Sequence, residues 1–272
     1  MHIDSLGFRT DIMLLTLGGG EVDDRGDHLV VRSPQAPDYW WGNFVLFRQA
    51  PAPGDLRSWE RAFTAGLPGS AHRAFGVDAA AAERSGCAEF AAAGYDVECS
   101  SVLTAAVLHA PPRPPRAATC RVLDLTDPRD LDAAIGVKLA NAAPDAPGGD
   151  ADFVAHRMEA MRELQVGGHG AWFGAFEDGR MLSGLGLFTD GAGIARFQSV
   201  DTRPQARRRG LAGALVHHAG THGLAEWGVT TLVIVADPDY HAIDIYRSVG
   251  FASTETQLQL ERAPQLVSSP AP

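Results

Sequence analysis

The spacing of hydrophobic and polar positions in the second half of the chain predicts short, well-separated elements. A strand is expected over 121–125, followed by a helix that Thr126 or Asp127 caps and that has Pro128 in its first turn. A turn-rich stretch leads from this helix to a second one, expected over 152–164. The region therefore begins as a strand followed by two helices.

Three apolar stretches then follow at short intervals, GAWFGAFE, RMLSGLGLF and GIARFQSV. The turn signals Asp178-Gly179 and Asp190-Gly191 separate them, so they predict an antiparallel meander. The spacing of apolar residues beyond the meander predicts a helix over 210–227, a buried strand over 230–237, a helix over 240–250 that ends at Gly250, and an alternating strand over 252–261.

The first half of the chain gives a weaker pattern, and its apolar run at residues 12–17 is interpreted as a strand. Four prolines within residues 109–118 exclude a helix there and favour an extended connector. The predicted organisation is therefore a domain over 1–110, a proline-rich linker over 111–118 and a second domain over 119–272. The expected fold class is α+β, with two tandem domains that each contain a mostly antiparallel, mixed sheet flanked by helices.

Charge and cysteine content restrict the classes of function. The formal net charge of −10 argues against nucleic acid or an anionic membrane surface as a partner. The three cysteines form no CxxC pair, which fits a reducing cytoplasm and predicts neither a disulfide framework nor a metal site. The first residues lack a basic segment followed by a long apolar run, so no signal peptide or membrane span is expected.

The segment QARRRGLAGALVHHAG, residues 205–220, places three arginines before a glycine at the start of the predicted helix over 210–227. Backbone N–H groups at such a helix start converge on one point and, with arginine side chains beside them, bind phosphate. Taken alone, the pattern also fits an exposed basic turn. The flanking residues decide between these interpretations.

With its flanks, the segment resembles the GNAT superfamily, the GCN5-related N-acetyltransferases. Arg207 to Ala212 match the family's Arg/Gln-x-x-Gly-x-Gly/Ala turn, and Val200 and Thr202 stand at the end of the fourth strand of that fold. A second family signature, Asn followed seven residues later by Tyr and then by Gly-Phe, is matched by Tyr246 and by Gly250-Phe251. Asp239 stands in place of the asparagine, and a carboxylate cannot donate the amide hydrogen bond.

This resemblance implies an acetyl-CoA-dependent N-acetyltransferase in which an acceptor amine attacks the thioester directly, with no metal. Tyr246 would protonate the leaving thiolate, and its hydroxyl is protonated at neutral pH, as that role needs. The base that deprotonates the acceptor is open between Asp201 and His241. The implied cofactor-binding residues are Val200, Thr202, Arg207, Arg208, Arg209, Gly210, Leu211, Ala212, Gly213 and Asp239.

The acceptor itself is a small-molecule or peptide amine that the sequence does not identify. Acidic residues between the first two helices of the second domain, Asp145, Asp150 and Asp152, favour a cationic acceptor, although a solvated loop explains them equally well. The alternative function is a non-catalytic acyl-CoA sensor or scaffold. A homodimer is the default expectation for the assembly.

The first half also contains an echo of the second. A strand, an aspartate, a helix, Gly94-Tyr95 and a strand follow in the same order as the elements around Gly250-Phe251. Phe90 stands where the second half has Tyr246, and a proline-rich stretch replaces the arginine-glycine turn. The hypothesis is a degenerate copy that binds no cofactor and helps to shape the acceptor pocket; the alternative is an unrelated α+β domain.

Overall fold

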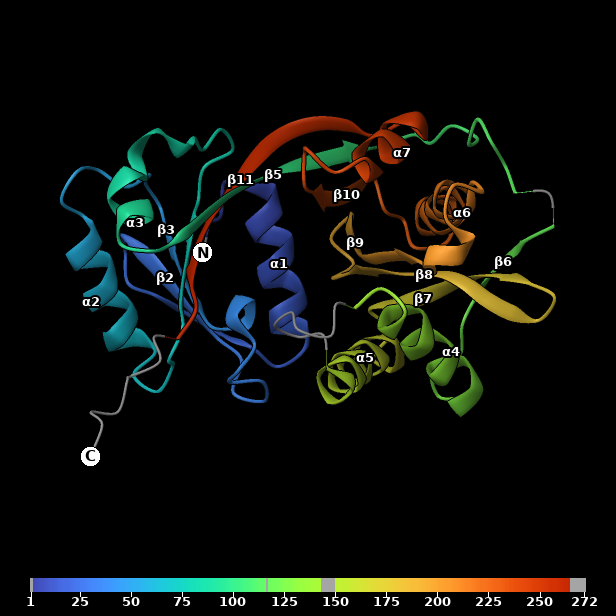
Figure 1. Ribbon diagram of the computed structural model, residues 1–272, viewed down its shortest axis with the longest axis horizontal. Helices are drawn as coiled ribbons and strands as arrows, with labels where there is room; N and C mark the ends of the chain where they lie inside the picture. The colour runs from blue at the N-terminus through green and yellow to red at the C-terminus, as the bar shows by residue number, and fades with distance from the viewer. Residues whose placement is uncertain (1, 116, 143–149, 265–272) are drawn as a thin grey trace. The chain divides into compact units, whose positions relative to one another are not determined.

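The computed structural model describes residues 2–115, 117–142 and 150–264 and divides into two compact units (Figure 1). Unit 1 comprises Met1–Val102 and Thr254–Pro272, and unit 2 comprises Leu103–Ser253. The division expected at 111–118 differs, because those residues lie inside unit 2 and most of the last strand lies in unit 1. The assignment of a degenerate first domain and a catalytic second one stays a prediction.

Unit 1 is a sheet in the order β1-β2-β3-β4-β11-β5. β1 pairs with β2 and β2 with β3 in antiparallel register, whereas β3 and β4 run parallel. Its elements are α1 (Leu6–Leu17), β1 (Glu21–Asp24), β2 (His28–Arg32), the 3-10 turn η1 (Trp40–Gly42), β3 (Phe44–Phe47), α2 (Leu56–Gly66), β4 (Arg73–Val77), the 3-10 turn η2 (Arg84–Gly86), α3 (Ala88–Ala92), and most of β5 (Asp96–Ala105) and β11 (Ala252–Arg262).

Two hydrophobic clusters cover the two faces of this sheet. On β2, Leu29 and Val31 belong to the cluster that contains Phe8 of α1, whereas Val30 belongs to the cluster that contains Trp59 of α2. This alternation follows from the two-residue period of a strand, which sends successive side chains to opposite faces. Unit 1 is therefore a sheet with α1 on one face and α2 and α3 on the other.

The prediction of a strand at residues 12–17 was wrong, because these residues form the second half of α1. The Ser5 hydroxyl caps the helix by accepting a hydrogen bond from the Phe8 N–H at 3.4 Å. Phe8 and Ile12, one helical turn apart, are buried on the sheet. The sequence interpretation did not recognise Ser5 as a helix cap. An apolar run of six residues fits a buried helix as well as it fits a strand.

Unit 2 is a sheet in the order β10-β9-β8-β7-β6, with the last residues of β5 beside β10. The predicted meander is confirmed, since β7 pairs antiparallel with β8 and β8 with β9, while β10 joins β9 in parallel. Its elements are β6 (Thr119–Val122), α4 (Pro128–Leu139), α5 (Ala151–Val166), β7 (Gly170–Glu177), β8 (Arg180–Thr189), β9 (Ile194–Thr202), the 3-10 turn η3 (Pro204–Ala206), α6 (Leu211–Glu226), β10 (Thr231–Ala236) and α7 (Ala242–Ser248).

Helices cover both faces of the unit 2 sheet. α4 and α5 pack on one side of β7 and β8, and α6 packs on the other (Figure 1). Asp127 is the cap of α4, and its carboxylate accepts a hydrogen bond from the Arg129 N–H at 2.9 Å. Of the two predicted caps, Asp127 is therefore the observed one, since the Thr126 hydroxyl donates to the Asp124 carboxylate instead.

The two halves of the chain repeat one succession of elements. From α1 to β5, a helix leads to three antiparallel strands, a helix, a parallel strand, a helix and a strand, and the same order runs from α5 to β11. Gly94 and Gly250 both take positive φ, 83° and 112°, at the turn after the last helix of each series. This order supports the hypothesis of an internal repeat.

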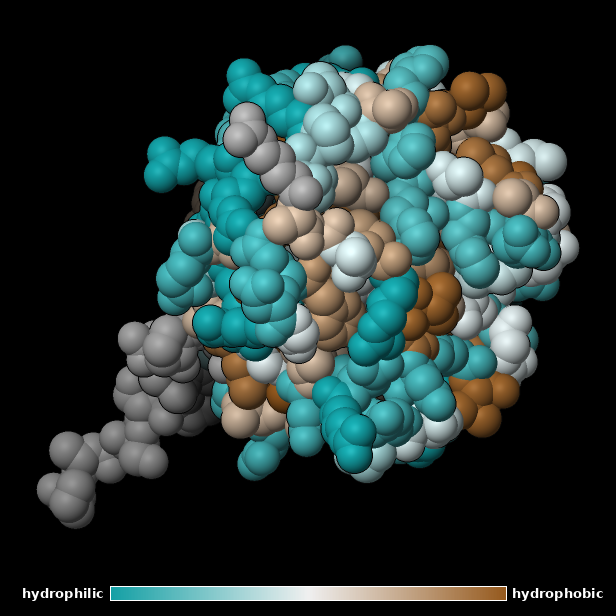
Figure 2. All heavy atoms as spheres, turned by 90° about the vertical axis from the view of Figure 1, so that its right-hand side faces the viewer, coloured by the Kyte–Doolittle hydropathy of each residue, from teal (hydrophilic) through white to brown (hydrophobic). Residues whose placement is uncertain are grey.

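The face of the molecule that Figure 2 shows is mostly polar. Figure 2 looks onto the side of the molecule at the right of Figure 1, where hydrophilic residues cover most of the face and hydrophobic residues form separate groups. Within residues 2–115, 117–142 and 150–264, no helix combines the length and the apolar character that a membrane crossing requires.

Candidate active site

The candidate site begins where two parallel strands of unit 2 stop pairing. The pairing of β10 with β9 runs from Thr231 opposite Ile194 to Val233 opposite Arg196, whereas β9 continues to Thr202. Between these points Ser199 has a positive φ of 52°, and the register of β9 with β8 shifts. A bulge of this kind bends a strand and redirects its residues. Beyond the bulge, Asp201 and Thr202 still pair with β8, whereas the pairing of β9 with β10 has ended at Arg196.

A cavity of about 1160 Å³ lies at this point, within unit 2. The end of β9, the start of α6, α7 and the proline-rich segment before β6 all contribute to it. Its lining consists of Pro111, Pro112, Arg113, Asn141, Val200, Asp201, Thr202, Pro204, Ala206, Arg207, Arg208, Gly210, Leu211, Ala212, Gly213, Tyr240, His241, Ala242, Asp244, Ile245, Tyr246 and Ser248. The structure therefore brings together the predicted site residues except Arg209 and Asp239.

The N-terminus of α6 opens into this cavity. Gly210 precedes the helix with a φ of 79°, and Arg208 has a φ of 62°, a conformation that is costly for a residue with a side chain. Among the described residues no side chain caps the helix, so the N–H groups of its first turn lack intrahelical acceptors. Left-handed residues next to free N–H groups form a concave anion site, to which the helix dipole adds positive potential.

The three arginines of the turn have different surroundings. Arg207 donates to the Asn141 side-chain oxygen at 2.7 Å and thus joins the turn to the end of α4. Arg209 donates to both carboxylate oxygens of Glu177 on β7, at 2.5 and 2.6 Å, and does not line the cavity. Arg208 lines the cavity and has no ion pair among the described residues. Of the three, Arg208 is the side chain best placed to meet an anion in the cavity.

Residues 107–115, here called the proline strap, form one wall of the same cavity. The strap is anchored by a hydrogen bond from the His109 N–H to the Val249 carbonyl at 3.0 Å. A Cβ atom on Gly210 would lie only 1.9 Å from the Arg113 carbonyl oxygen. Sequence reasoning missed this contact because it interpreted the prolines as a connector. The signal was present, since prolines fix an extended path that can also serve as a rigid wall.

Tyr246 and Asp201 face the same cavity from α7 and β9. Tyr246 is 6% exposed, and burial together with the charge of Asp201 raises its pKa to about 12. Burial also raises the pKa of the Asp201 carboxyl, and the Lys138 ammonium, 3.3 Å away, opposes part of that rise. The cavity therefore contains a phenol that remains protonated at neutral pH and a carboxyl whose affinity for a proton is increased.

Two sets of residues selected from the sequence lie elsewhere. Asp239 is exposed outside the cavity lining, and its N–H donates to the Asp237 carboxylate at 2.8 Å. Of the acidic loop, Asp150 caps α5 through the Phe153 N–H at 2.8 Å, Asp152 lies in the first turn of the helix, and Asp145 is outside the described residues. Asp150 is therefore explained by its role as a helix cap.

Comparisons with known proteins identify the family of one segment and structures with a similar fold. Residues 140–251 match the model of the acetyltransferase (GNAT) family, so this segment is a GNAT acetyltransferase domain. It includes the whole arginine turn, Tyr246 and Phe251, but not the proline strap. No curated protein matches the sequence significantly.

Three solved structures are similar over nearly the whole chain. A functionally unknown conserved protein from Staphylococcus epidermidis has a TM-score of 0.71 at 13% identity, covering 90% of this chain and 95% of its own. A GCN5-related N-acetyltransferase from Kribbella flavida has a TM-score of 0.63 at 14% identity, and the match covers 97% of this chain and 98% of its own. A tandem GNAT protein from the clavulanic acid biosynthesis pathway has a TM-score of 0.58 at 15% identity, and the match covers 94% of this chain and 89% of its own. At these identities the likeness is one of fold.

Proposed function

We propose that unit 2 transfers an acetyl group from acetyl-CoA to an amine. The observation that carries the proposal is the convergence of three features in one cavity of unit 2: the uncapped start of α6, the open end of β9 and the phenol of Tyr246. The family match of residues 140–251 supports it. A binding site and a proton donor in one cavity are what acyl transfer needs.

The residues present fit acetyl-CoA, a long ligand with a diphosphate in its middle. The first N–H groups of α6 and Arg208 would hold the diphosphate, and Arg113 of the strap adds a second guanidinium outside the family motif. The backbone of Val200 and Thr202 would pair with the pantetheine amides. When bound, acetyl-CoA supplies the thioester carbonyl that the acceptor amine attacks.

Tyr246 and Asp201 perform the proton transfers in this proposal. With a pKa of about 12, the Tyr246 hydroxyl is protonated across the working pH range and donates its proton to the leaving sulfur. Asp201 accepts the proton that the acceptor ammonium must lose, and the Lys138 ammonium favours the ionised form of this carboxyl, against the effect of burial. We prefer Asp201 to His241 as the base because the charge of Asp201 contributes to the raised pKa of Tyr246, which places this base near the proposed acid.

The acceptor is proposed as a small-molecule or peptide amine, with Asp201 and Asp244 in the lining favouring a cation. A cytoplasmic location, the absence of nucleic-acid or membrane partners and a homodimeric assembly remain proposals from the sequence, in line with the net charge of −10. Unit 1, as a degenerate copy, is proposed to bind no acetyl-CoA.

The experiment is a calorimetric titration of acetyl-CoA into the full chain and two variants of Ala212, which lines the cavity in the first turn of α6. Ala212→Glu suits the helix, because an acidic residue near its start is favourable, yet it repels a diphosphate. Acetyl-CoA should bind at least about tenfold more weakly to this variant. Ala212→Gln, of the same size and uncharged, should lose clearly less.

Turnover is followed in the same preparations with a panel of amines. Tyr246→Phe should bind acetyl-CoA as the unchanged chain does and lose turnover, which separates an enzyme from a non-catalytic sensor. If acetyl-CoA bound equally well to the glutamate and glutamine variants, the diphosphate would not bind at this turn. Binding without turnover of any amine would leave the sensor as the function of the site.

A further inference from the structure

A second recess, of about 580 Å³, lies within unit 1, far along the chain from the arginine turn. It is formed by one side of α2, the start of β4 and the end of β11. Four arginines line it with a single carboxylate, and the whole lining consists of Arg57, Glu60, Arg61, Thr64, Ala65, Arg73 and Arg262. These residues, here called the arginine recess, concentrate positive charge in a chain of net charge −10.

Two of these arginines are held rigidly. The Arg73 guanidinium lies 4.9 Å from the centre of the Phe63 ring and donates to the carbonyls of Ser70 and His72 at 3.0 and 2.7 Å. The Arg262 guanidinium lies 4.4 Å from the centre of the Tyr95 ring and donates to the Ala93 carbonyl at 3.2 Å. Stacking and backbone hydrogen bonds fix both planar groups in advance of any ligand.

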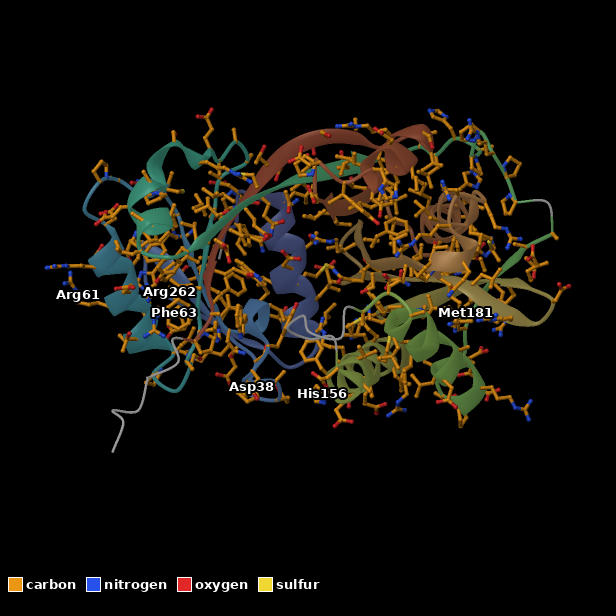
Figure 3. The ribbon with its side chains drawn as sticks, viewed as in Figure 1. Asp38, Arg61, Phe63, His156, Met181 and Arg262 are labelled. Atoms are coloured by element: carbon orange, nitrogen blue, oxygen red, sulfur yellow. The ribbon has the colours of Figure 1, made fainter. Side chains whose placement is uncertain are left out.

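The other two arginines carry charge without a partner. Arg57 and Arg61 lie one turn apart on the exposed side of α2, and neither makes a hydrogen bond or ion pair with the described residues. Figure 3 shows Arg61 extending away from α2, while Arg262 and Phe63 lie between α2 and the sheet. The recess thus combines two fixed guanidinium groups with two that are free to close on a ligand.

This arrangement is unfavourable in the absence of an anion. Arg57 and Arg61 form a like-charged pair at i and i+4, and Arg73 lies directly opposite Arg262 in the β4–β11 ladder. Both arrangements are destabilising. Glu60 offsets only part of this charge, because its carboxylate already pairs with Arg262 at 2.8 Å and accepts from the Tyr95 hydroxyl at 3.1 Å. Like-charge contacts that one carboxylate offsets only in part are typical of a functional site that binds the opposite charge.

We propose that the arginine recess is a binding site for a small polyanion that carries a diphosphate group. Guanidinium groups bind phosphate oxygens in pairs, and a diphosphate neutralises several of them at once, whereas a single carboxylate cannot. The confinement of the charge to one recess argues for a compact ligand, because a nucleic acid needs a basic surface extended along its backbone. The site is separate from the arginine turn of unit 2 and does not depend on the function proposed there.

The test is a calorimetric titration of inorganic pyrophosphate into the full chain at low salt. Arg57→Ala/Arg61→Ala removes two exposed side chains whose loss leaves the core intact. Arg208→Ala removes the side chain best placed to bind an anion in the unit 2 cavity, and Arg129→Ala, an exposed arginine of α4, is the matched charge control.

The unchanged chain and Arg129→Ala should bind pyrophosphate alike, and Arg208→Ala should retain the binding that belongs to the recess. The double variant should weaken that binding by about tenfold or more. Equal binding by the double variant and the unchanged chain would overturn the proposal, as would the absence of binding in Arg208→Ala. Citrate is titrated in the same way. If it bound to the recess more tightly than pyrophosphate does, the recess would be a site for carboxylates and the proposal of a diphosphate ligand would be overturned.

Discussion

Lys138 acts against burial on the pKa of the Asp201 carboxyl, the proposed base. Its ammonium lies 3.3 Å from Asp201 Oδ2 and lowers a pKa that burial raises above the ordinary value of 3.8. Because the native pKa is raised, the native state holds this proton more tightly than the unfolded chain does. The contribution of Asp201 to the free energy of unfolding therefore falls as the pH rises through the interval between the two pKa values.

Lys138→Met should move the acid limb of the kcat/KM profile to higher pH, because the Asp201 carboxylate loses its nearest cation. Lys138→Arg keeps the charge and should leave the limb close to its original position. The measurement is kcat/KM against pH with one acceptor, so that the titration of the amine is common to all three proteins. If the acid limb did not move in Lys138→Met, Asp201 would not be the base in the proton transfer.

At the scale of single residues, the sequence predicted the composition of the site better than the function of each member. The motif predicted that Arg208 and Gly210 lie together, and they share the cavity. It could not show that Arg209 turns to Glu177, because Glu177 is distant in sequence and only the folded sheet brings it close. Lys138 and Asn141 were missed for the same reason, since α4 lies before the matched motif.

At the scale of elements, long periodic segments were predicted well and short ones poorly. The strand β7 was predicted at its observed bounds, and α6 within one residue at each end, because turn signals and apolar spacing agreed there. The helix α1 was missed because its apolar residues fill a short run whose period is ambiguous. The prediction that the proline-rich residues form no helix is confirmed, but the strap's role as a cavity wall depends on a contact with Gly210.

The contact between the strap and the arginine turn gives a prediction for stability. Gly210→Ala must take a φ near 79° and must also move the Arg113 carbonyl, which lies 1.9 Å from the new Cβ. The free energy of unfolding should fall by about 2 kcal/mol or more. Gly213→Ala is the matched variant three residues on, with its nearest contact at 3.4 Å, and should be neutral or more stable by up to about 1 kcal/mol.

Urea unfolding of both variants, followed by circular dichroism, measures the difference. Similar stabilities for the two alanine variants would mean that the strap leaves the turn readily. The strap would then be a mobile cover of the cavity and not one of its walls.

At the scale of the whole molecule, chain order and compact units do not coincide. Sequence patterns predicted β11 as the last strand of the second domain, yet in unit 1 it pairs antiparallel with β4, from Leu258 opposite Val77 to Arg262 opposite Arg73. The last residues of β5, in turn, belong to unit 2. Strand patterns show which residues are extended but not which partner a strand takes, so this exchange could not be predicted from one sequence.

A cut at the proline-rich linker should therefore fail to release a folded domain. The fragment 119–272 loses the strap and the end of β5, which belong to unit 2, and it retains β11 without β4. Exposed strand edges of this kind associate, so we expect the fragment to aggregate or to unfold without a cooperative transition. Co-expression with the fragment 1–118 restores every strand of both sheets and should restore a cooperative thermal transition near that of the intact chain. A fragment 119–272 that unfolds cooperatively by itself would show that β11 can leave unit 1 and that the two halves of the chain fold independently.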